Sequence, residues 1–431
     1  MNGAGSRAAG RESRRVWITG MGLITSIGIG REAFWDGLHA QRSEVKRIDR
    51  FDASQFRSQV AAQVDDFEPT DYMDAKTARQ TDRFSQFALA AGRMAILDAG
   101  LTVGSKGSAR PDRFGVYIGS ALGGIAYAEV QHERFMERGI RSVAPNLALA
   151  VFGGAAPANL GIALGLHGPI LSTANSCAAG AVALGEALRL IRSGSADAAL
   201  AGGVEVPLSP LAFGAFDVIR ALSAHHNDAP TSAARPFDAD RDGFVMGEAA
   251  ALLVLESADV AQRRGARPYA ELRGFGATSD AFHMVQPRPD GRQAARAARI
   301  ALADGAMKAA EIDYVNAHAS STPLGDGVEA AAIARALGPR SRTVPVSGTK
   351  AYYGHPLGAS GAIEAAIAAL AISRGWAPGT VNLSEPDVQA VEALPGLMSA
   401  PLEGDFRAVL STSFGFGGLN AALAFSAVDG N

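Results

Sequence analysis

Short runs of apolar residues alternate along the chain with longer segments of helical periodicity. The runs predict strands at 16–20, 114–119, 170–174, 198–204, 250–256, 314–317, 344–348 and 408–412. The segments between them predict helices at 81–98, 178–192, 293–304, 327–337 and 357–374. The strands show little alternation, which is typical of strands covered on both faces. This order of elements predicts an α/β fold with layered sheets.

The elements form two groups separated by a loop-rich stretch at 223–243, which is dense in turn residues. A boundary near residue 260 gives halves with a similar order of elements, although the residues show no strong repeat. We therefore expect three parts. Residues 1–14 are polar, basic and rich in Gly, Ala and Ser, and predict a disordered tail. Residues 15–260 hold the lone cysteine, and residues 261–431 hold two histidines of interest.

The composition excludes several classes of protein. Hydrophobic residues make up 48% of the 431 positions, which excludes a disordered chain and allows a large core. The net charge of −3 disfavours nucleic-acid binding, which needs a concentrated cationic face. Residues 142–185 carry no charged side chain, but prolines, asparagines and a histidine interrupt them. We expect a core or subunit-interface stretch there, and no membrane span.

The chain contains a single cysteine, Cys177. One cysteine excludes an intramolecular disulfide and any site built from several cysteines. It also fits a reducing compartment, and residues 1–14 are not followed by an apolar stretch of signal-peptide type. We therefore expect a cytoplasmic protein.

Cys177 lies between a predicted strand and a predicted helix of small residues. A sulfur in a turn at a helix N-terminus is exposed to the helix dipole and to free N–H groups, which favour the thiolate. The competing interpretation is an inert buried thiol. The position of Cys177 by itself leaves the two interpretations even.

Two of the eight histidines, His318 and His355, each follow an apolar strand. Strand ends are where open α/β sheets place their sites. A cysteine with two histidines permits acyl-thioester chemistry without a metal. A metal site would lack a clear fourth ligand, so we expect none, while a hydrolase using one histidine as base stays open.

Several longer motifs make the chain resemble the β-ketoacyl-acyl-carrier-protein synthases of the thiolase superfamily, nearest to the type II elongating ketosynthases. The resemblance runs from residue 15 to about 426 and rests on GSALGG (119–124), the Cys177 segment, AGGVEV (201–206), VNAHASSTPLGD (315–326), SGTKAYYGHPLGASGAIEA (347–365) and STSFGFGGLNAAL (411–423). It implies a thiolase-like fold, in which two pseudo-repeated halves form a layered α-β-α-β-α core.

The resemblance also implies a reaction. Cys177 takes an acyl chain from an acyl carrier protein as a thioester. His318 and His355 bind malonyl-acyl carrier protein and promote loss of CO2, and the resulting carbanion attacks the acyl group to give 3-oxoacyl-acyl carrier protein. Lys350 tunes and orients the histidine pair, and Glu364 matches the family's structural carboxylate.

Further roles follow from the same resemblance. Phe416 is the gating phenylalanine, and its N–H group and that of Cys177 form the oxyanion hole. Ser320 and Thr322 bind the phosphopantetheine arm, which arrives on the carrier, so no cofactor of the enzyme's own is expected. Leu122 lies against the acyl chain. A homodimer is expected, and candidate contacts for the acidic carrier are basic residues: Lys76, Arg79, Arg83 and Arg220.

The chain departs from the family pattern at several positions. Asn175 and Ser176 replace the usual Thr/Ala pair before the nucleophile, and the stretch 145–164, expected at the dimer interface and pocket floor, fits poorly. The acyl preference and the choice between fatty acid and polyketide-type biosynthesis therefore stay open. Two alternatives remain. One is a non-catalytic partner subunit that sets chain length, which would lack Cys177. The other is a degradative thiolase, which would need a second cysteine.

Overall fold

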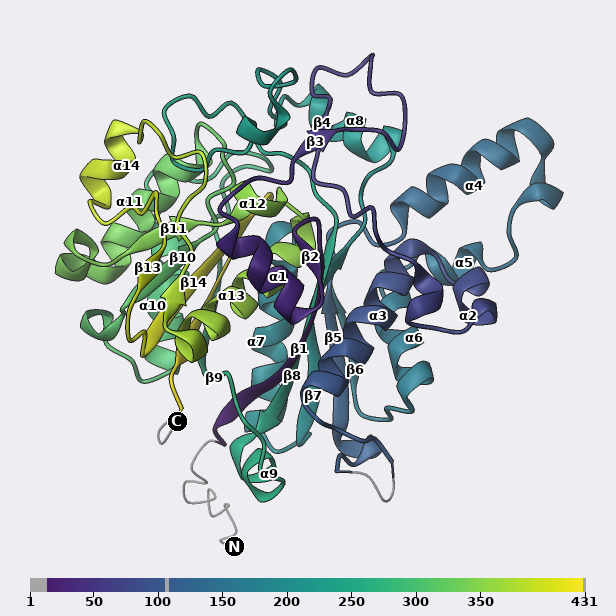
Figure 1. Cartoon of the computed structure of the whole chain (residues 1–431), viewed down its shortest axis with the longest axis horizontal. Coiled ribbons are helices and arrows are strands. Elements are labelled where there is room, and N and C mark those ends of the chain that lie inside the picture. Colours follow the sequence, from purple (N-terminus) through teal and green to yellow (C-terminus); the bar gives the residue numbers. More distant parts are fainter. Residues whose placement is uncertain (1–13, 105–107, 429–431) are drawn as a thin grey trace, which may run out of the picture.

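The computed structural model describes residues 14–104 and 108–428 (Figure 1). Within these residues, eleven strands form one large sheet: β1 (Val16–Thr25), β2 (Gly28–Ile29), β5 (Phe114–Gly119), β6 (Ile170–Thr173), β7 (Ala198–Glu205), β8 (Ala249–Ser257), β9 (Ala270–Ser279), β10 (Tyr314–Ala317), β11 (Val346–Gly348), β14 (Ala408–Gly415) and β15 (Leu419–Ser426). Two small sheets pair β3 (Lys46–Arg47) with β4 (Val60–Ala61) and β12 (Trp376–Ala377) with β13 (Leu402–Glu403).

The helices lie mostly between consecutive strands. They are α1 (Arg31–His39), α2 (Ala75–Gln80), α3 (Arg83–Asp98), α4 (Ile125–Arg138), α5 (Leu147–Ala150), α6 (Ala155–Leu164), α7 (Ala179–Arg192), α8 (Pro210–Val218), α9 (Ala258–Arg263), α10 (Arg292–Asp304), α11 (Gly325–Leu337), α12 (Lys350–Tyr353), α13 (Ser360–Arg374) and α14 (Val388–Ala393). In Figure 1, α4 extends away from the body of the molecule.

The sheet consists of two halves with the same topology. The first half has the order β1-β8-β7-β5-β6, and the second has β9-β15-β14-β10-β11. In each half the first three strands pair antiparallel and the last three pair parallel. A short antiparallel contact between β1 and β9 joins the halves. The structure is therefore a duplication that is not evident from the residues.

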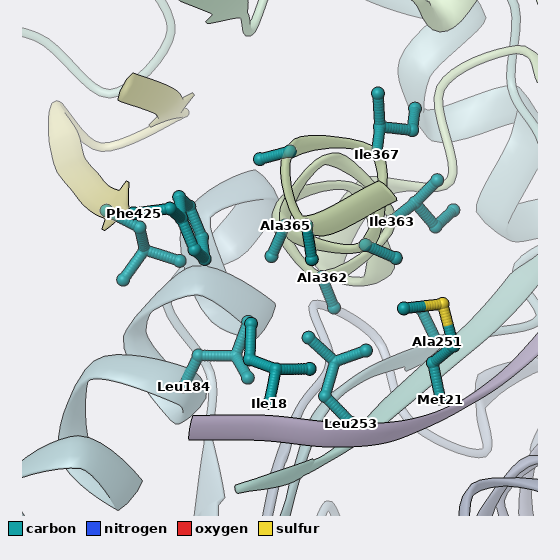
Figure 2. Close-up of a cluster of buried hydrophobic side chains, with 14 of the residues drawn as sticks. Ile18, Met21, Leu184, Ala251, Leu253, Ala362, Ile363, Ala365, Ile367 and Phe425 are labelled. Carbon is teal, nitrogen blue, oxygen red and sulfur yellow. The ribbon is translucent and has the colours of Figure 1, made fainter. Parts of the chain in front are cut away.

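Helices cover both halves and also separate them. α3 and α6 pack on the outer face of the first half, and α10 packs on the outer face of the second. α11 packs beside α10 and shares a hydrophobic cluster with β10 and β14. α7 and α13 lie between the halves and contact strands of both. Figure 2 shows α13 end-on among side chains from β1, β8, α7 and β15, with Ile18, Leu253, Leu184 and Phe425 around it. The expected α-β-α-β-α layering of a thiolase-like fold is thus confirmed.

Small residues allow the two central helices to approach closely. A Cβ at Gly180, in α7, would lie 2.8 Å from the Gly358 carbonyl oxygen and 3.2 Å from the Ala362 Cβ. Because no room exists for a side chain there, glycine at 180 brings the start of α7, just after Cys177, against the turn that follows His355. The fold thereby places the cysteine beside a histidine far away in sequence.

The predicted elements agree with the structure except at particular points. β6 is the last strand of its half, and Ile170 and Leu171 are 46% and 37% exposed, so a single copy of the chain does not cover both faces of this strand as the pattern predicts. The sequence did not predict β9 or β15. The predicted tail at 1–14 lies outside the described residues except for Arg14, which pairs with Asp197 at 3.0 Å.

The uncharged stretch at 142–185 folds into several short elements and not into one long helix. A different helical stretch, Leu357–Arg374, is the one in the described ranges that is long and apolar enough to cross a membrane. Because 83% of its apolar window is buried inside the protein, it is interpreted as the core helix around which the two halves pack.

Candidate active site

Cys177 lies in a short 3-10 turn (Ser176–Ala178) between β6 and α7, and it is 7% exposed. Burial raises the pKa of its thiol to about 11, although the Ser176 hydroxyl, the positive charge of Lys350 and the Phe416 N–H group act in the opposite direction. The direction is opposite to the expectation that this position favours the free thiolate, because loss of hydration on burial is the largest effect on the pKa. Ionisation of Cys177 requires a nearby base.

His355 provides such a base. Its Nε2 lies 3.1 Å from the Cys177 Sγ, and its Nδ1 lies 2.8 Å from the Ser360 Oγ at the start of α13. The ring is buried, and burial, with a smaller contribution from Lys350, lowers its pKa well below the usual range. His355 is therefore neutral at physiological pH, and it can accept a proton.

His318 lies at the end of β10, with its ring centroid 5.2 Å from that of His355. Its main-chain N–H group and that of Ala319 donate to the Glu329 carboxylate at 2.7 and 2.6 Å. Burial lowers the pKa of His318, and the charge of Lys350 lowers it further. Glu329 thus fixes the backbone at His318. The lowered pKa keeps the His318 imidazole neutral.

Lys350 fixes the orientation of the His318 ring. Its Nζ lies 3.2 Å from the His318 Nδ1, and it also donates to the His318 carbonyl oxygen and pairs with Glu364. Lys350 and Glu364 are both buried, and burial raises the pKa of Glu364 to about 8. Because an ammonium group can only donate, the His318 Nδ1 must accept, and its proton lies on Nε2.

A third buried carboxylate supports the turn that follows His355. Glu205, at the end of β7, accepts from the main-chain N–H groups of Ala121, Leu122 and Gly358 and from the Ser120 hydroxyl, at 2.6 to 3.1 Å. Burial raises the pKa of Glu205 to about 7. Sequence reasoning missed Glu205 and Glu329. For Glu205 the available signal was a single carboxyl in an otherwise apolar strand.

A cavity of about 360 Å³ opens over these groups. It is lined by residues predicted for the site: Cys177, His318, His355, Ser320, Thr322, Phe416 and Arg220. The Ser320 and Thr322 hydroxyl groups lie 3.1 Å apart. Leu122 does not line this cavity. It packs instead against the hydrophobic cluster that contains Cys177, Leu208 and Phe244.

The predicted carrier contacts lie in different surroundings. Lys76 and Arg79 are exposed on α2, outside the cavity lining, and Arg220 is exposed at the cavity. Arg83 pairs with the fully buried Glu248 at 3.0 Å. Its guanidinium also donates to the Val64 carbonyl oxygen, so Arg83 already has partners within the protein, and its role in docking stays a prediction.

The donor atoms of Cys177, His318 and His355 lie within 4.8 Å of one another, as metal ligands would. Among the described residues no fourth His, Cys, Asp or Glu joins this cluster. The ammonium group of Lys350 lies 3.2 Å from the His318 Nδ1. A cation held between these donors would face the positive charge of Lys350, so the geometry does not favour a metal.

The arrangement defines a class of enzyme. A buried thiol beside a neutral imidazole can take up an acyl group, and a second neutral imidazole can donate to a developing oxyanion next to it. Together with the duplicated five-layered core, this is the architecture of the thiolase-like condensing enzymes.

Comparison with known proteins gives the family. The profile described as beta-ketoacyl synthase, N-terminal domain, matches residues 13–261, and the profile of the C-terminal domain matches residues 269–384. The chain is 41% identical to 3-oxoacyl-[acyl-carrier-protein] synthase 2 of Synechocystis sp., over 97% of this chain and 99% of that protein. It is 40% identical to the protein of the same name from Coxiella burnetii, over 97% and 99%.

Solved structures of ketosynthases are similar to this chain as well. The ishigamide ketosynthase/chain length factor has a TM-score of 0.89 and 34% identity, over 97% of this chain and 100% of that chain. A ketosynthase of the AntDE:AntF complex, a type II PKS acyl-carrier protein bound to its ketosynthase, has a TM-score of 0.89 and 31% identity, with the same coverage. The chain belongs to the beta-ketoacyl synthase family, and it is an acyltransferase of the ketosynthase type.

Proposed function

We propose that the protein catalyses a decarboxylative Claisen condensation between an acyl chain on Cys177 and malonyl-acyl carrier protein, giving 3-oxoacyl-acyl carrier protein. One observation carries the proposal. The Cys177 Sγ lies 3.1 Å from the His355 Nε2, with His318 beside it at the end of a single cavity. This geometry assembles a nucleophile, a base and an oxyanion donor from three distant segments.

The first half-reaction loads the enzyme. The Cys177 thiol gives its proton to the His355 Nε2, and Sγ attacks the carbonyl carbon of the incoming thioester. The C–S bond to the carrier's pantetheine breaks, and His355 returns the proton to the leaving thiolate. During attack, the carbonyl oxygen becomes an oxyanion, which the main-chain N–H groups of Cys177 and Phe416 stabilise. The Phe416 N–H group faces the sulfur, which supports this role.

The second half-reaction uses the histidines as donors. As the malonyl C–C bond breaks, CO2 leaves and the electron pair moves onto the thioester oxygen. The His318 Nε2–H donates to that oxygen, since Lys350 occupies Nδ1. The Ser360 hydroxyl can either accept from or donate to the His355 Nδ1, so His355 can act as base when the enzyme is loaded and as N–H donor here.

Condensation closes the cycle. The malonyl-derived carbanion attacks the carbonyl carbon of the Cys177 thioester, the new C–C bond forms, and the C–S bond to Cys177 breaks. The Cys177 thiolate takes up one proton from solvent, which the His355 Nε2 can relay, and the product leaves on the carrier. No redox step occurs, so we propose no cofactor besides the carrier's own phosphopantetheine, and no metal. The Ser320 and Thr322 hydroxyl groups are proposed to bind that arm along the cavity.

An acyl carrier protein is the proposed partner, and we propose a homodimer in the cytoplasm. The edge of the sheet at β6 is unpaired in the described chain, and apolar side chains are exposed near it: Phe135, Met136, Ile140, Phe152, Ile162, Ile170 and Leu171. These apolar side chains lie on α4, α6, β6 and the segments between α4 and α6, and their exposure supports a second copy as the cover. The lone cysteine supports a reducing compartment.

A non-catalytic partner subunit and a degradative thiolase are both less well supported. The complete Cys–His–His arrangement would have no role in a silent subunit, and a thiolase would need a second cysteine that the chain lacks. The test is product formation: purified protein, an acyl donor and malonyl-acyl carrier protein should give 3-oxoacyl-carrier and CO2 in equal amounts. The Cys177→Ala variant should give no 3-oxoacyl product. Condensation by that variant would overturn the proposal.

A further inference from the structure

Ser176, the residue directly before the nucleophile, has an unusual backbone conformation. Its φ is +50°, in the left-handed region that side chains other than Gly, Asn and Asp seldom adopt. Glycine would adopt this conformation without strain. Backbone strain of this kind clusters at active sites. Ser176 also stands where the family resemblance has an alanine, so its hydroxyl is a feature of this chain.

The side chain of Ser176 lies between the nucleophile and the loop that carries Phe416. Its Oγ is 3.8 Å from the Cys177 Sγ, within hydrogen-bond range for sulfur. On its other side is Gly415, where a Cβ would come within 3.1 Å of the Ser176 Cβ and 3.0 Å of the Cys177 nitrogen. The Phe416 loop thus packs tightly against Ser176.

The groups around the Cys177 sulfur determine whether a hydrogen bond from the Ser176 hydroxyl would stabilise its thiolate. The charged and titratable groups that face Sγ are His355, which contacts it, His318 beside it, and the buried Lys350 and Glu205. Burial and Glu205 disfavour the thiolate, while Lys350, Ser176 and the Phe416 N–H group favour it. Cys177 is only 7% exposed, so few water molecules can hydrate its sulfur, and fixed donors must stabilise the negative charge.

We propose that the Ser176 hydroxyl donates a hydrogen bond to the Cys177 sulfur as the thiolate forms, which makes Ser176 a catalytic residue of acyl loading. The assignment of loading as the reaction rests on the proposed function. The hydrogen bond itself does not, because it acts on the thiol whatever electrophile arrives.

The test is the pH dependence of Cys177 alkylation by iodoacetamide, read as the mass of the intact protein. Since Cys177 is the single cysteine, each added carbamidomethyl group on sulfur reports this residue. Ser176→Ala removes the hydroxyl and keeps Cβ, while Ser176→Gly removes the hydroxyl and relieves the strained backbone. The matched control is Ser193→Ala, at the other end of α7, whose exposed hydroxyl donates to the Leu190 carbonyl oxygen.

Both Ser176 variants should move the midpoint of alkylation upward by about 0.5 to 1 pH unit, so that the rate below the midpoint falls roughly three- to tenfold. The control should match the unchanged protein. A wild-type midpoint in Ser176→Ala would overturn the proposal, and so would a shift in Ser176→Gly alone, since that result would assign the effect to the backbone.

Failure of the proposed function gives a different pattern. In that case the unchanged protein takes up no acyl group from any carrier, whereas the alkylation midpoints still separate the Ser176 variants from the control. Circular dichroism of each variant shows whether it is folded, and Ser176→Gly, which has no steric conflict at positive φ, keeps the test available if Ser176→Ala does not fold.

Discussion

Replacing Glu205 by Gln should lower the free energy of unfolding of the protein. The same substitution should also lower the pKa of the Cys177 thiol. Both oxygens of Glu205 accept hydrogen bonds, Oε1 from Ser120 and Leu122 and Oε2 from Ala121 and Gly358. Either oxygen of the carboxyl group can accept, whereas the NH2 group of Gln can only donate, so whichever oxygen the NH2 group replaces leaves at least one buried main-chain N–H group without a partner.

The magnitude follows from those contacts. Each buried donor left unsatisfied costs about 1–3 kcal/mol, so one or two of them give a loss of about 1–6 kcal/mol at pH 5. Burial raises the pKa of Glu205 from 4.5 to about 7. Since the folded pKa lies above the unfolded one, the contribution of the wild-type carboxyl is complete below about pH 4.5 and is lost as the pH rises through about 7. A shift of that size is worth at most about 3 kcal/mol, so the stability gap between wild type and variant should narrow toward pH 8.

Urea unfolding of both proteins between pH 5 and pH 8 measures this gap, because titrations shared by the two proteins cancel in the difference. The same variant should lower the midpoint of Cys177 alkylation, since the negative charge of Glu205 raises the thiol pKa. This is opposite in sign to the effect expected at Ser176. A stability gap that stays constant or widens with pH would refute the reasoning, as would an unchanged or higher midpoint.

Three further predictions concern substrates. His318→Ala should still load Cys177, but its condensation rate should fall by about 10²–10⁴-fold. His355→Ala should slow both half-reactions, because the His355 Nε2 contacts the Cys177 Sγ. Separate mass-spectrometric assays of loading and condensation check this, and a wild-type condensation rate in either variant would contradict it. Charge reversal at Arg79 or Arg220 should raise the KM for carrier-bound substrate, and the increase should be larger at low salt. Steady-state kinetics at two ionic strengths measure this KM, and an unchanged KM in both variants would count against this docking surface. Leu122→Phe should shorten the longest acyl chain accepted without affecting short ones, since Leu122 packs in the cluster around Cys177; an unchanged chain-length profile would show that the chain runs elsewhere.

Much of the fold followed from the sequence where an element is apolar and bounded by small residues. β5 and β10 have the bounds that the pattern predicts, and the ends of β10 and β11 lead into His318 and the segment of His355. β9 and β15 were missed because glycine and alanine interrupt the β-branched signal that marks a strand. The duplication was also hidden, because topology repeats here while the residues do not.

The site residues also divide into those that the sequence identified and those that it did not. Cys177, His318 and His355 were identifiable because each follows a strand and carries chemistry that a core does not need. Glu205 and Glu329 were not, because a carboxyl in an apolar element shows its role only when the main-chain N–H groups around it are placed. The direction of the Cys177 pKa also required the structure, since the sequence shows the helix terminus and not the degree of burial.

The central claim is that Cys177 carries the acyl chain and that malonyl-carrier removes it by condensation. The most direct test is intact-protein mass spectrometry of the enzyme, first after mixing with a panel of acyl carrier proteins and then after adding malonyl-acyl carrier protein. The account predicts a mass increase of one acyl group, located on Cys177 by peptide mapping and absent from Cys177→Ala. The second addition should remove it as the 3-oxoacyl-carrier product appears. An acyl group on another residue, or one that is lost only as free acid, would contradict the account.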